Sequence, residues 1–125
     1  LEEVKATMKS EYIQIVDARG KARFEGKDPE PRPGLRSGHI PGSYNIPYTG
    51  LITPHNSTLL NEIELKKIFL QHRINIDGKI IATCGSGISA SLIALALYVC
   101  GNEKTAVYDG SWTEWGGRKD TDVHI

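Results

Sequence analysis

A single cysteine stands where an apolar, β-branched run gives way to glycine and serine. In the segment IIATCGSGISASLIALALYVCG, residues 80–101, Cys84 ends the first run and precedes a longer apolar stretch. Glycine adopts backbone conformations closed to other residues, so the amide groups of residues 85–89 can converge on one point. The helix expected after them adds the positive end of its dipole. Because such a cradle stabilises a thiolate, we predict that Cys84 is a nucleophile and not merely a small buried side chain.

The other cysteine and the histidines offer no comparable pattern. Cys100 lies inside the apolar stretch and is expected to be a buried packing residue. Two cysteines do not make a disulfide framework, and no Cys or His pair has the spacing of zinc ligands. We therefore expect no metal and favour a reducing compartment. We assign no chemistry to the histidines, which are His39, His55, His72 and His124.

Two other anion-binding loops match part of the same stretch. Residues 85–90, GSGISA, satisfy the glycine fingerprint of a dinucleotide-binding turn, and Asp109 lies where a ribose-binding acid would fall. Only sixteen residues follow Asp109, however, which is too few for the further strands of such a fold. A cysteine phosphatase needs an arginine at the end of its loop, whereas the sixth residue after Cys84 is Ala90. Both remain alternatives of lower rank.

Length and charge limit the classes of function. A chain of 125 residues can bury a real core, so we predict one domain over residues 1–125. Fifteen basic residues balance fifteen acidic ones, which gives no reason to expect a nucleic-acid or membrane partner. Residues 92–100, the longest apolar run, are too few to span a bilayer. Because the chain begins with Leu1 and not methionine, we expect a piece of a longer protein whose targeting segment lies elsewhere.

Strand-like segments recur along the chain. Short apolar runs predict strands at residues 12–19, 43–48, 78–84 and 104–110. Between the first two strands, glycine, proline and charged residues predict a long structured loop over residues 20–42. The third strand ends at Cys84, so the candidate nucleophile is expected at a strand's carboxyl end.

Helix-like segments alternate with these strands. The spacing of apolar residues predicts helices at residues 1–8, 61–73 and 89–101, the last ended by Gly101. The second helix is expected to place its apolar residues mostly on one face, and they are Ile63, Leu65, Ile68, Phe69 and Ile74. The alternation predicts an α/β fold, with a central parallel sheet, helices on both faces and right-handed crossovers. Such sheets carry their sites at the carboxyl ends of the strands, where Cys84 is expected.

Four motifs, in order, give the chain a family resemblance. They are VDARGKARFEG, PEPRPGLRSGHIPGSYNIPY, CGSGISA and YDGSWTEW. Together they resemble the C-terminal, catalytic domain of thiosulfate or 3-mercaptopyruvate sulfurtransferases, the rhodanese family, over nearly the whole chain. The resemblance implies a rhodanese-like three-layer fold. It also implies that the chain is the C-terminal half of a two-domain enzyme, whose N-terminal rhodanese-like domain contributes part of the pocket.

The resemblance also implies roles for single residues. Arg23 and Arg32 resemble the family's substrate-carboxylate ligands, and a planar guanidinium binds a carboxylate through two parallel hydrogen bonds. Ser86 resembles the loop serine that assists Cys84, although an ordinary turn hydroxyl is an equal alternative. The remaining loop residues are expected to bind substrate, and they are Gly85, Gly87, Ile88 and Ser89.

Other polar and aromatic residues near these motifs have simpler interpretations. Arg19 and Arg36 are expected to be solvated or to tie loops, and Asp17 is expected to satisfy local hydrogen bonds. Trp112 is a weaker candidate for the wall of the pocket mouth, since large aromatics at helical spacing, such as Trp112 and Trp115, more often pack in a core.

The expected reaction is sulfur transfer through a persulfide on Cys84. Thiosulfate-preferring relatives carry basic residues right after the nucleophile, whereas CGSG resembles the loop of mercaptopyruvate sulfurtransferases, so 3-mercaptopyruvate is the favoured donor. Thioredoxin, a small thiol or cyanide is the expected acceptor, with no cofactor, in the cytosol or the mitochondrion. The alternative is a non-catalytic rhodanese-like module for protein binding, in which Cys84 is buried or unreactive.

Overall fold

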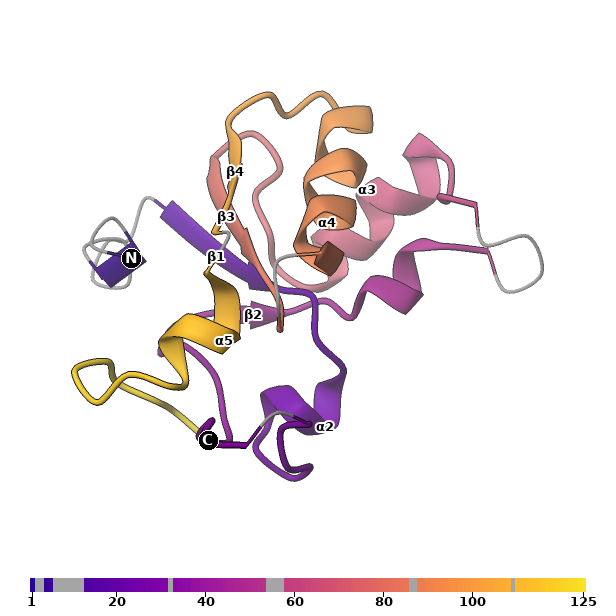
Figure 1. Cartoon of the computed structure of the whole chain (residues 1–125). Helices are drawn as coiled ribbons and strands as arrows, with labels where there is room; N and C mark the ends of the chain where they lie inside the picture. The colour runs from indigo at the N-terminus through magenta and orange to yellow at the C-terminus, as the bar shows by residue number, and fades with distance from the viewer. Residues whose placement is uncertain (2–3, 6–12, 32, 54–57, 86–87, 109) are drawn as a thin grey trace.

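The protein is built around one parallel sheet. The structure, a computed structural model, describes residues 1, 4–5, 13–31, 33–53, 58–85, 88–108 and 110–125. The four strands lie in the order β2–β1–β3–β4 (Figure 1). Their bounds are Ile13–Asp17 for β1, Tyr44–Asn45 for β2, Lys79–Thr83 for β3 and Thr105–Val107 for β4. β1 pairs with β3 in parallel from Ile13 with Lys79 to Asp17 with Thr83. The two central strands therefore end side by side.

Two apolar layers cover the sheet because side chains along a strand alternate between its faces. On β1, Val16 belongs to one buried cluster and Ile15 to the other. On β3, Ile80 belongs to the same cluster as Val16, and Ile81 belongs to the same cluster as Ile15. Both faces of the central strands are therefore buried, as expected for a parallel sheet flanked by helices.

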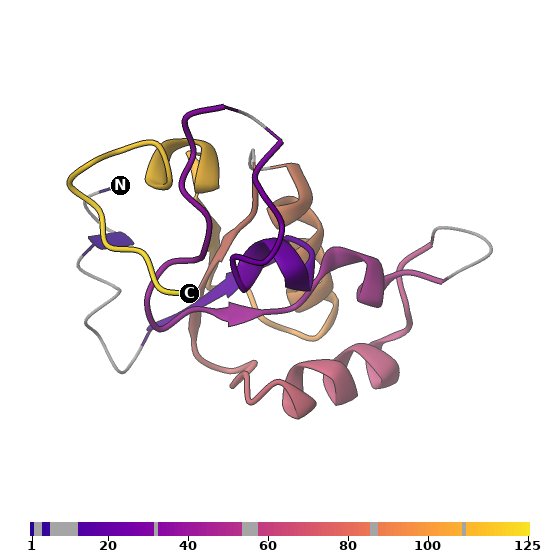
Figure 2. The same ribbon diagram turned by 90° about the horizontal axis from the view of Figure 1, so that it is seen from below.

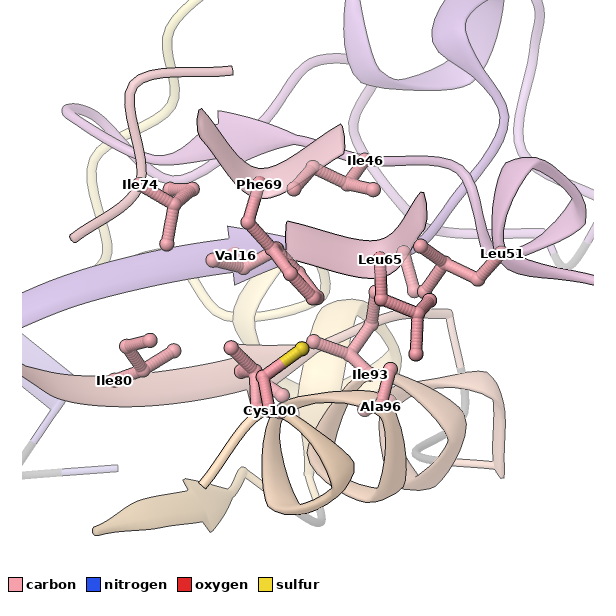
Figure 3. Packing of buried hydrophobic residues seen from close by; sticks show 14 of the residues in the cluster. Val16, Ile46, Leu51, Leu65, Phe69, Ile74, Ile80, Ile93, Ala96 and Cys100 are labelled. Carbon is pink, nitrogen blue, oxygen red and sulfur yellow. The ribbon is translucent and has the colours of Figure 1, made fainter. Parts of the chain in front are cut away.

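The first layer contains helices α3 (Glu62–Gln71) and α4 (Ile88–Val99). Leu65 and Phe69 of α3 are fully buried and face the sheet with Ile93 of α4 (Figure 3). Each such side chain contributes about 1.5–3 kcal/mol when it is fully buried. Cys100 lies in this cluster as a packing residue, which confirms its predicted role.

Local signals explain where these two helices begin and end. The Asn61 side chain accepts a hydrogen bond from the backbone N–H of Glu64 at 2.9 Å and so caps the start of α3. Gly101 has a φ of 95°, a left-handed conformation that ends α4 as predicted. Within the described part of the chain, no helix has the length and apolar character needed to cross a membrane.

The second layer contains the short helix α5 (Ser111–Trp115). Its indoles, Trp112 and Trp115, are fully buried with Val4, Ile15 and Ile40. The views in Figures 1 and 2 place α5 away from α3, with the sheet between them. Two further short elements, α2 (Lys21–Phe24) and the 3-10 helix η1 (Tyr48–Leu51), follow β1 and β2.

Several sequence-based boundaries need correction. The loop predicted over residues 20–42 contains α2, which is too short to produce an apolar period. Ile63 was expected on the apolar face of α3, but its side chain is 70% exposed because it points away from Leu65 and Phe69. Most of the helix predicted over residues 1–8 lies outside the described residues.

Candidate active site

Cys84 lies immediately after β3, at the carboxyl end of the sheet, as predicted. The first turn of α5 fixes the backbone that follows its side chain. The Cys84 carbonyl accepts a hydrogen bond from Trp112 N at 2.8 Å, and the Gly85 carbonyl accepts from Thr113 N at 2.9 Å and from Thr113 Oγ1 at 2.7 Å. Cys84, the predicted nucleophile, is therefore held by backbone hydrogen bonds at the end of a central strand.

Ser111 supports Cys84 from the buried side. Its Oγ accepts a hydrogen bond from Cys84 N at 3.1 Å and donates to the Tyr108 carbonyl at 2.7 Å. The same oxygen lies 4.0 Å from Cys84 Sγ. Because a hydroxyl has one proton and the Tyr108 carbonyl is closer, Ser111 acts mainly as an acceptor for the Cys84 amide.

Ser111 makes these contacts in an unusual backbone conformation. Its φ of 49° lies in the left-handed region, which costs a residue with a side chain about 1–2 kcal/mol. The conformation brings Oγ between the end of β3 and Tyr108, where the side chain is fully buried. This serine was not singled out in the sequence, because only the fold brings residue 111 to residue 84.

A pocket of about 270 Å³ opens at Cys84. Cys84 itself is 2% exposed, and with Gly85 and Ser89 it forms one wall. Leu35 and Tyr48 contribute an apolar and aromatic part of the lining. Cys84 is thus a buried residue that borders the pocket.

Charged residues form another part of the lining, the charged wall of the pocket, and they are Arg19, Arg23 and Glu30. Arg19 is buried and makes a bidentate ion pair with Asp17, with Nη2 at 2.8 Å and Nε at 3.1 Å from Oδ2. Nη2 also donates to the Gly38 carbonyl at 2.7 Å. These contacts confirm that Arg19 ties loops and that Asp17 satisfies local hydrogen bonds.

Arg23 reaches the loop that follows Cys84. Its Nη2 donates to Glu30 Oε1 at 2.8 Å and lies 2.9 Å from the point where a side chain on Gly85 would begin. The pairing with Glu30 raises the pKa of Arg23, and the charges of Asp17 and Cys84 act in the same direction. Glycine at position 85 thus allows a permanent positive charge to lie directly against the loop.

The structure brings together four of the residues that the sequence proposed for the site, namely Cys84, Gly85, Ser89 and Arg23. Arg32, Ser86 and Gly87 lie outside the described residues. Ile88 begins α4.

Trp112 lies beneath the pocket wall and does not line it. It is 1% exposed, its Nε1 donates to the Arg36 carbonyl at 2.8 Å, and the Arg19 guanidinium carbon lies 4.4 Å from the centroid of its ring. Its position therefore matches the packing alternative. A cation above the face of an indole ring is held by a cation–π attraction, so Trp112 helps to hold the Arg19 guanidinium in place.

Arg36 ties the loop before β2 to the C-terminal segment. It donates to the carbonyls of Trp115, Gly116, Arg118 and Thr121 and to Thr121 Oγ1. Of the two roles expected from the sequence, loop tying is the one observed. Among the described residues, no group of three or more His, Cys, Asp or Glu side chains is arranged to hold a metal ion.

Comparison with known proteins identifies the family. The model of the rhodanese-like domain matches residues 1–118. Thiosulfate/3-mercaptopyruvate sulfurtransferase 1, mitochondrial, of Arabidopsis thaliana is 47% identical over 123 residues, which are 98% of this chain and 32% of that protein. The 3-mercaptopyruvate sulfurtransferase of Homo sapiens is 40% identical over 114 residues, which are 91% of this chain and 38% of that protein.

A solved structure agrees with the sequence matches. The crystal structure of SseA from Escherichia coli matches this chain with a TM-score of 0.76 and 37% identity, over 90% of this chain. Its description names the "Rhodanese" fold and catalytic mechanism of 3-mercaptopyruvate sulfotransferases. The chain therefore belongs to the rhodanese-like domain family, and the predicted three-layer α/β fold is confirmed. It spans 40% of the SseA chain, so it corresponds to less than half of each of these proteins.

Proposed function

We propose that this chain is the cysteine-bearing domain of a sulfurtransferase, which carries sulfur from 3-mercaptopyruvate or thiosulfate as a persulfide on Cys84. The observation that carries the proposal is a cysteine at the carboxyl end of a central strand, facing a pocket with an arginine beside its loop. The named activity of the Arabidopsis and human relatives supports the same chemistry.

The first step takes sulfur from the donor. The Cys84 thiolate attacks the sulfur of 3-mercaptopyruvate, the carbon–sulfur bond breaks, and its electron pair leaves with the carbon as the enolate of pyruvate. The thiol proton of the donor ends on that carbon, so pyruvate departs and a persulfide anion remains on Cys84. Arg23 is suited to bind the donor's carboxylate, since a guanidinium offers donors on more than one edge. Arg32 is assigned the same role by resemblance.

The loop after Cys84 is proposed to stabilise the anions of this step. By resemblance to the family's loop, the backbone N–H groups of Gly85, Gly87, Ile88 and Ser89 are proposed to bind the persulfide. Amide dipoles that are fixed before the reaction need no reorganisation as charge develops. Ser86 is proposed to relay a proton or to stabilise the thiolate.

The second step returns the enzyme to its starting state. A thiol, thioredoxin or cyanide attacks the outer sulfur, the sulfur–sulfur bond breaks, and the Cys84 thiolate is released. No cofactor takes part in this scheme. We further propose that a second rhodanese-like domain of the same protein completes the pocket, and that the protein works in the cytosol or the mitochondrion.

The burial of Cys84 favours one other function. A thiol that is 2% exposed is also what a non-catalytic, protein-binding rhodanese-like module would have. The two functions differ in reactivity, because the enzyme must admit small anions to Cys84 through the pocket.

Steady-state turnover separates these functions. The protein at its full natural length is mixed with 3-mercaptopyruvate or thiosulfate and with cyanide, and thiocyanate formation is measured for wild type and Cys84→Ser. We expect turnover in the wild type that Cys84→Ser lowers at least about a thousandfold, the scale of removing a nucleophile. Equal rates in both proteins, or none in the wild type, would favour the binding module.

A further inference from the structure

A buried carboxylate stands between the two arginines of the pocket. The Glu30 side chain is 1% exposed and lies 3.4 Å from Arg19 Nη1 through Oε2. Its Oε2 also accepts from Arg23 Nε at 3.3 Å, and its Oε1 accepts from Arg23 Nη2 at 2.8 Å. A carboxylate that is buried away from water needs positively charged hydrogen-bond or ion-pair partners. Glu30 and the guanidinium groups of Arg19 and Arg23 therefore form one buried charge cluster.

Glu30 fixes the orientation of Arg23. The Arg23 side chain is 30% exposed, and a long side chain with that exposure samples several rotamers unless charged hydrogen bonds hold it. The bidentate contact with Glu30 uses Nε and one N–H of Nη2. It leaves Nη1 and the outer N–H of Nη2 for the pocket, with Nη2 against Gly85.

Glu30 also cancels charge. Arg19 is matched by Asp17, and Arg23 is matched by Glu30, so these four residues carry no net charge. Because its charges balance, this wall offers hydrogen-bond donors to a ligand without producing a strong positive electrostatic potential. Such a wall suits an anion with one negative charge, whereas a dianion needs excess positive charge to repay the loss of its hydration.

We infer that Glu30 is a positioning residue that determines donor specificity: it holds Arg23 beside Gly85 and lowers the positive potential at Cys84, so donors with a single carboxylate are preferred to dianions. The inference rests on the proposed function. No pattern in the sequence singles out Glu30, which is one of several charged residues in a proline-rich loop. Only the fold brings it against Arg19 and Arg23.

The substitution Glu30→Gln tests the specificity. Glutamine keeps the shape of the side chain and one acceptor for Arg23 but removes the negative charge. We expect the ratio of kcat/KM for thiosulfate to kcat/KM for 3-mercaptopyruvate to rise about tenfold, the effect of one unpaired charge at short range in a partly screened site. Glu25→Gln is the matched control, since Glu25 lies near Lys27 outside the pocket lining and its loss should leave the ratio unchanged. An equal fall for both donors would show a merely structural role and contradict the inference.

A second measurement is independent of sulfur transfer. Iodoacetate and iodoacetamide alkylate the same thiol and differ mainly in charge, so the ratio of their rates at Cys84, read from the mass of its peptide, reports the potential in the pocket. Glu30→Gln should raise the iodoacetate to iodoacetamide ratio several-fold, and Arg23→Gln should lower it. If wild type transfers no sulfur, the proposed function fails while this ratio still tests Glu30. An unchanged ratio in either variant that folds would overturn the inference.

Discussion

At the scale of single residues, Cys84 depends on groups that are distant in the sequence. Ser111 Oγ accepts a hydrogen bond from the Cys84 N–H, and Arg23 lies against Gly85, the next residue of the loop. Neither contact is a matter of local propensity, because the partners are separated by long stretches of chain. The residue types of a cysteine loop could be read from the sequence, but the side chains that orient the loop required the fold.

Replacing Ser111 should destabilise the protein through the Cys84 backbone. Ser111→Ala leaves the buried Cys84 N–H without its acceptor, which should lower the free energy of unfolding by about 1–3 kcal/mol. Urea denaturation measures the change. Ser111→Gly also lacks the hydroxyl but fits a φ of 49° without strain, so it should lose less than Ser111→Ala. Equal stability of wild type and Ser111→Ala would contradict the assigned contact.

At the scale of elements, the C-terminal segment is attached to the loop that follows α2. His39 and His124 exchange backbone hydrogen bonds of 2.9 Å, and the His39 ring stacks on Phe24 with a centroid separation of 3.8 Å. Gly38, beside this bridge, has a φ of 120°, and a side chain there would lie 2.5 Å from the His124 carbonyl oxygen. The last residues of the chain therefore brace the helix that carries Arg23.

The contribution of the His39 contacts to the stability of the protein should decrease at acidic pH. Burial lowers the pKa of His39 from its ordinary value of 6.5, and the nearby His124 and Arg19 act in the same direction. The hydrogen bond to the Phe24 carbonyl and the charge of Asp17 oppose that shift but do not outweigh it. Because the unfolded chain then binds more protons than the folded one, stability should be full above about pH 6.5 and should fall as the pH drops below it.

Chemical denaturation at pH 7.5 and at successively lower pH measures this effect. His39→Gln keeps a polar side chain that does not titrate, so its unfolding free energy should fall less steeply than that of wild type over the same range. His72→Gln is the control, since His72 is exposed at the end of α3. If the unfolding free energy fell with pH at the same slope in wild type and His39→Gln, His39 would not be the cause of the loss of stability in acid.

The elements that the sequence predicted best are those with their own periodic signal. α3 and α4 are long enough to show an apolar period, and β3 carries a nearly continuous apolar run that is followed by Cys84. α2 and α5 are only about one helical turn long, so their formation depends on tertiary packing and not on their own periodic signal. The charged wall of the pocket was only half predicted: Arg23 came from a motif, whereas Glu30 is recognisable only by its burial against both arginines.

At the scale of the whole molecule, one sheet with two apolar layers brings Cys84, the proposed nucleophile, and the charged wall of the pocket to the same edge. β1 leads into the segment with Arg19 and Arg23, and β3 leads to Cys84, so the parallel register places both at the carboxyl end. The chain covers 38% or less of the Arabidopsis and human relatives. The second domain in our proposal concerns the part of those relatives that this chain does not cover.

Intact-mass spectrometry after a brief incubation with 3-mercaptopyruvate, and separately with thiosulfate, tests the proposed persulfide most directly. The full-length protein, the 125-residue chain and the Cys84→Ser variant are compared. We predict a gain of one sulfur atom, about 32 Da, that cyanide removes and that requires Cys84. A gain in the full-length protein alone would assign part of the site to the remainder of the chain. No gain in the full-length protein with either donor would contradict the sulfurtransferase function.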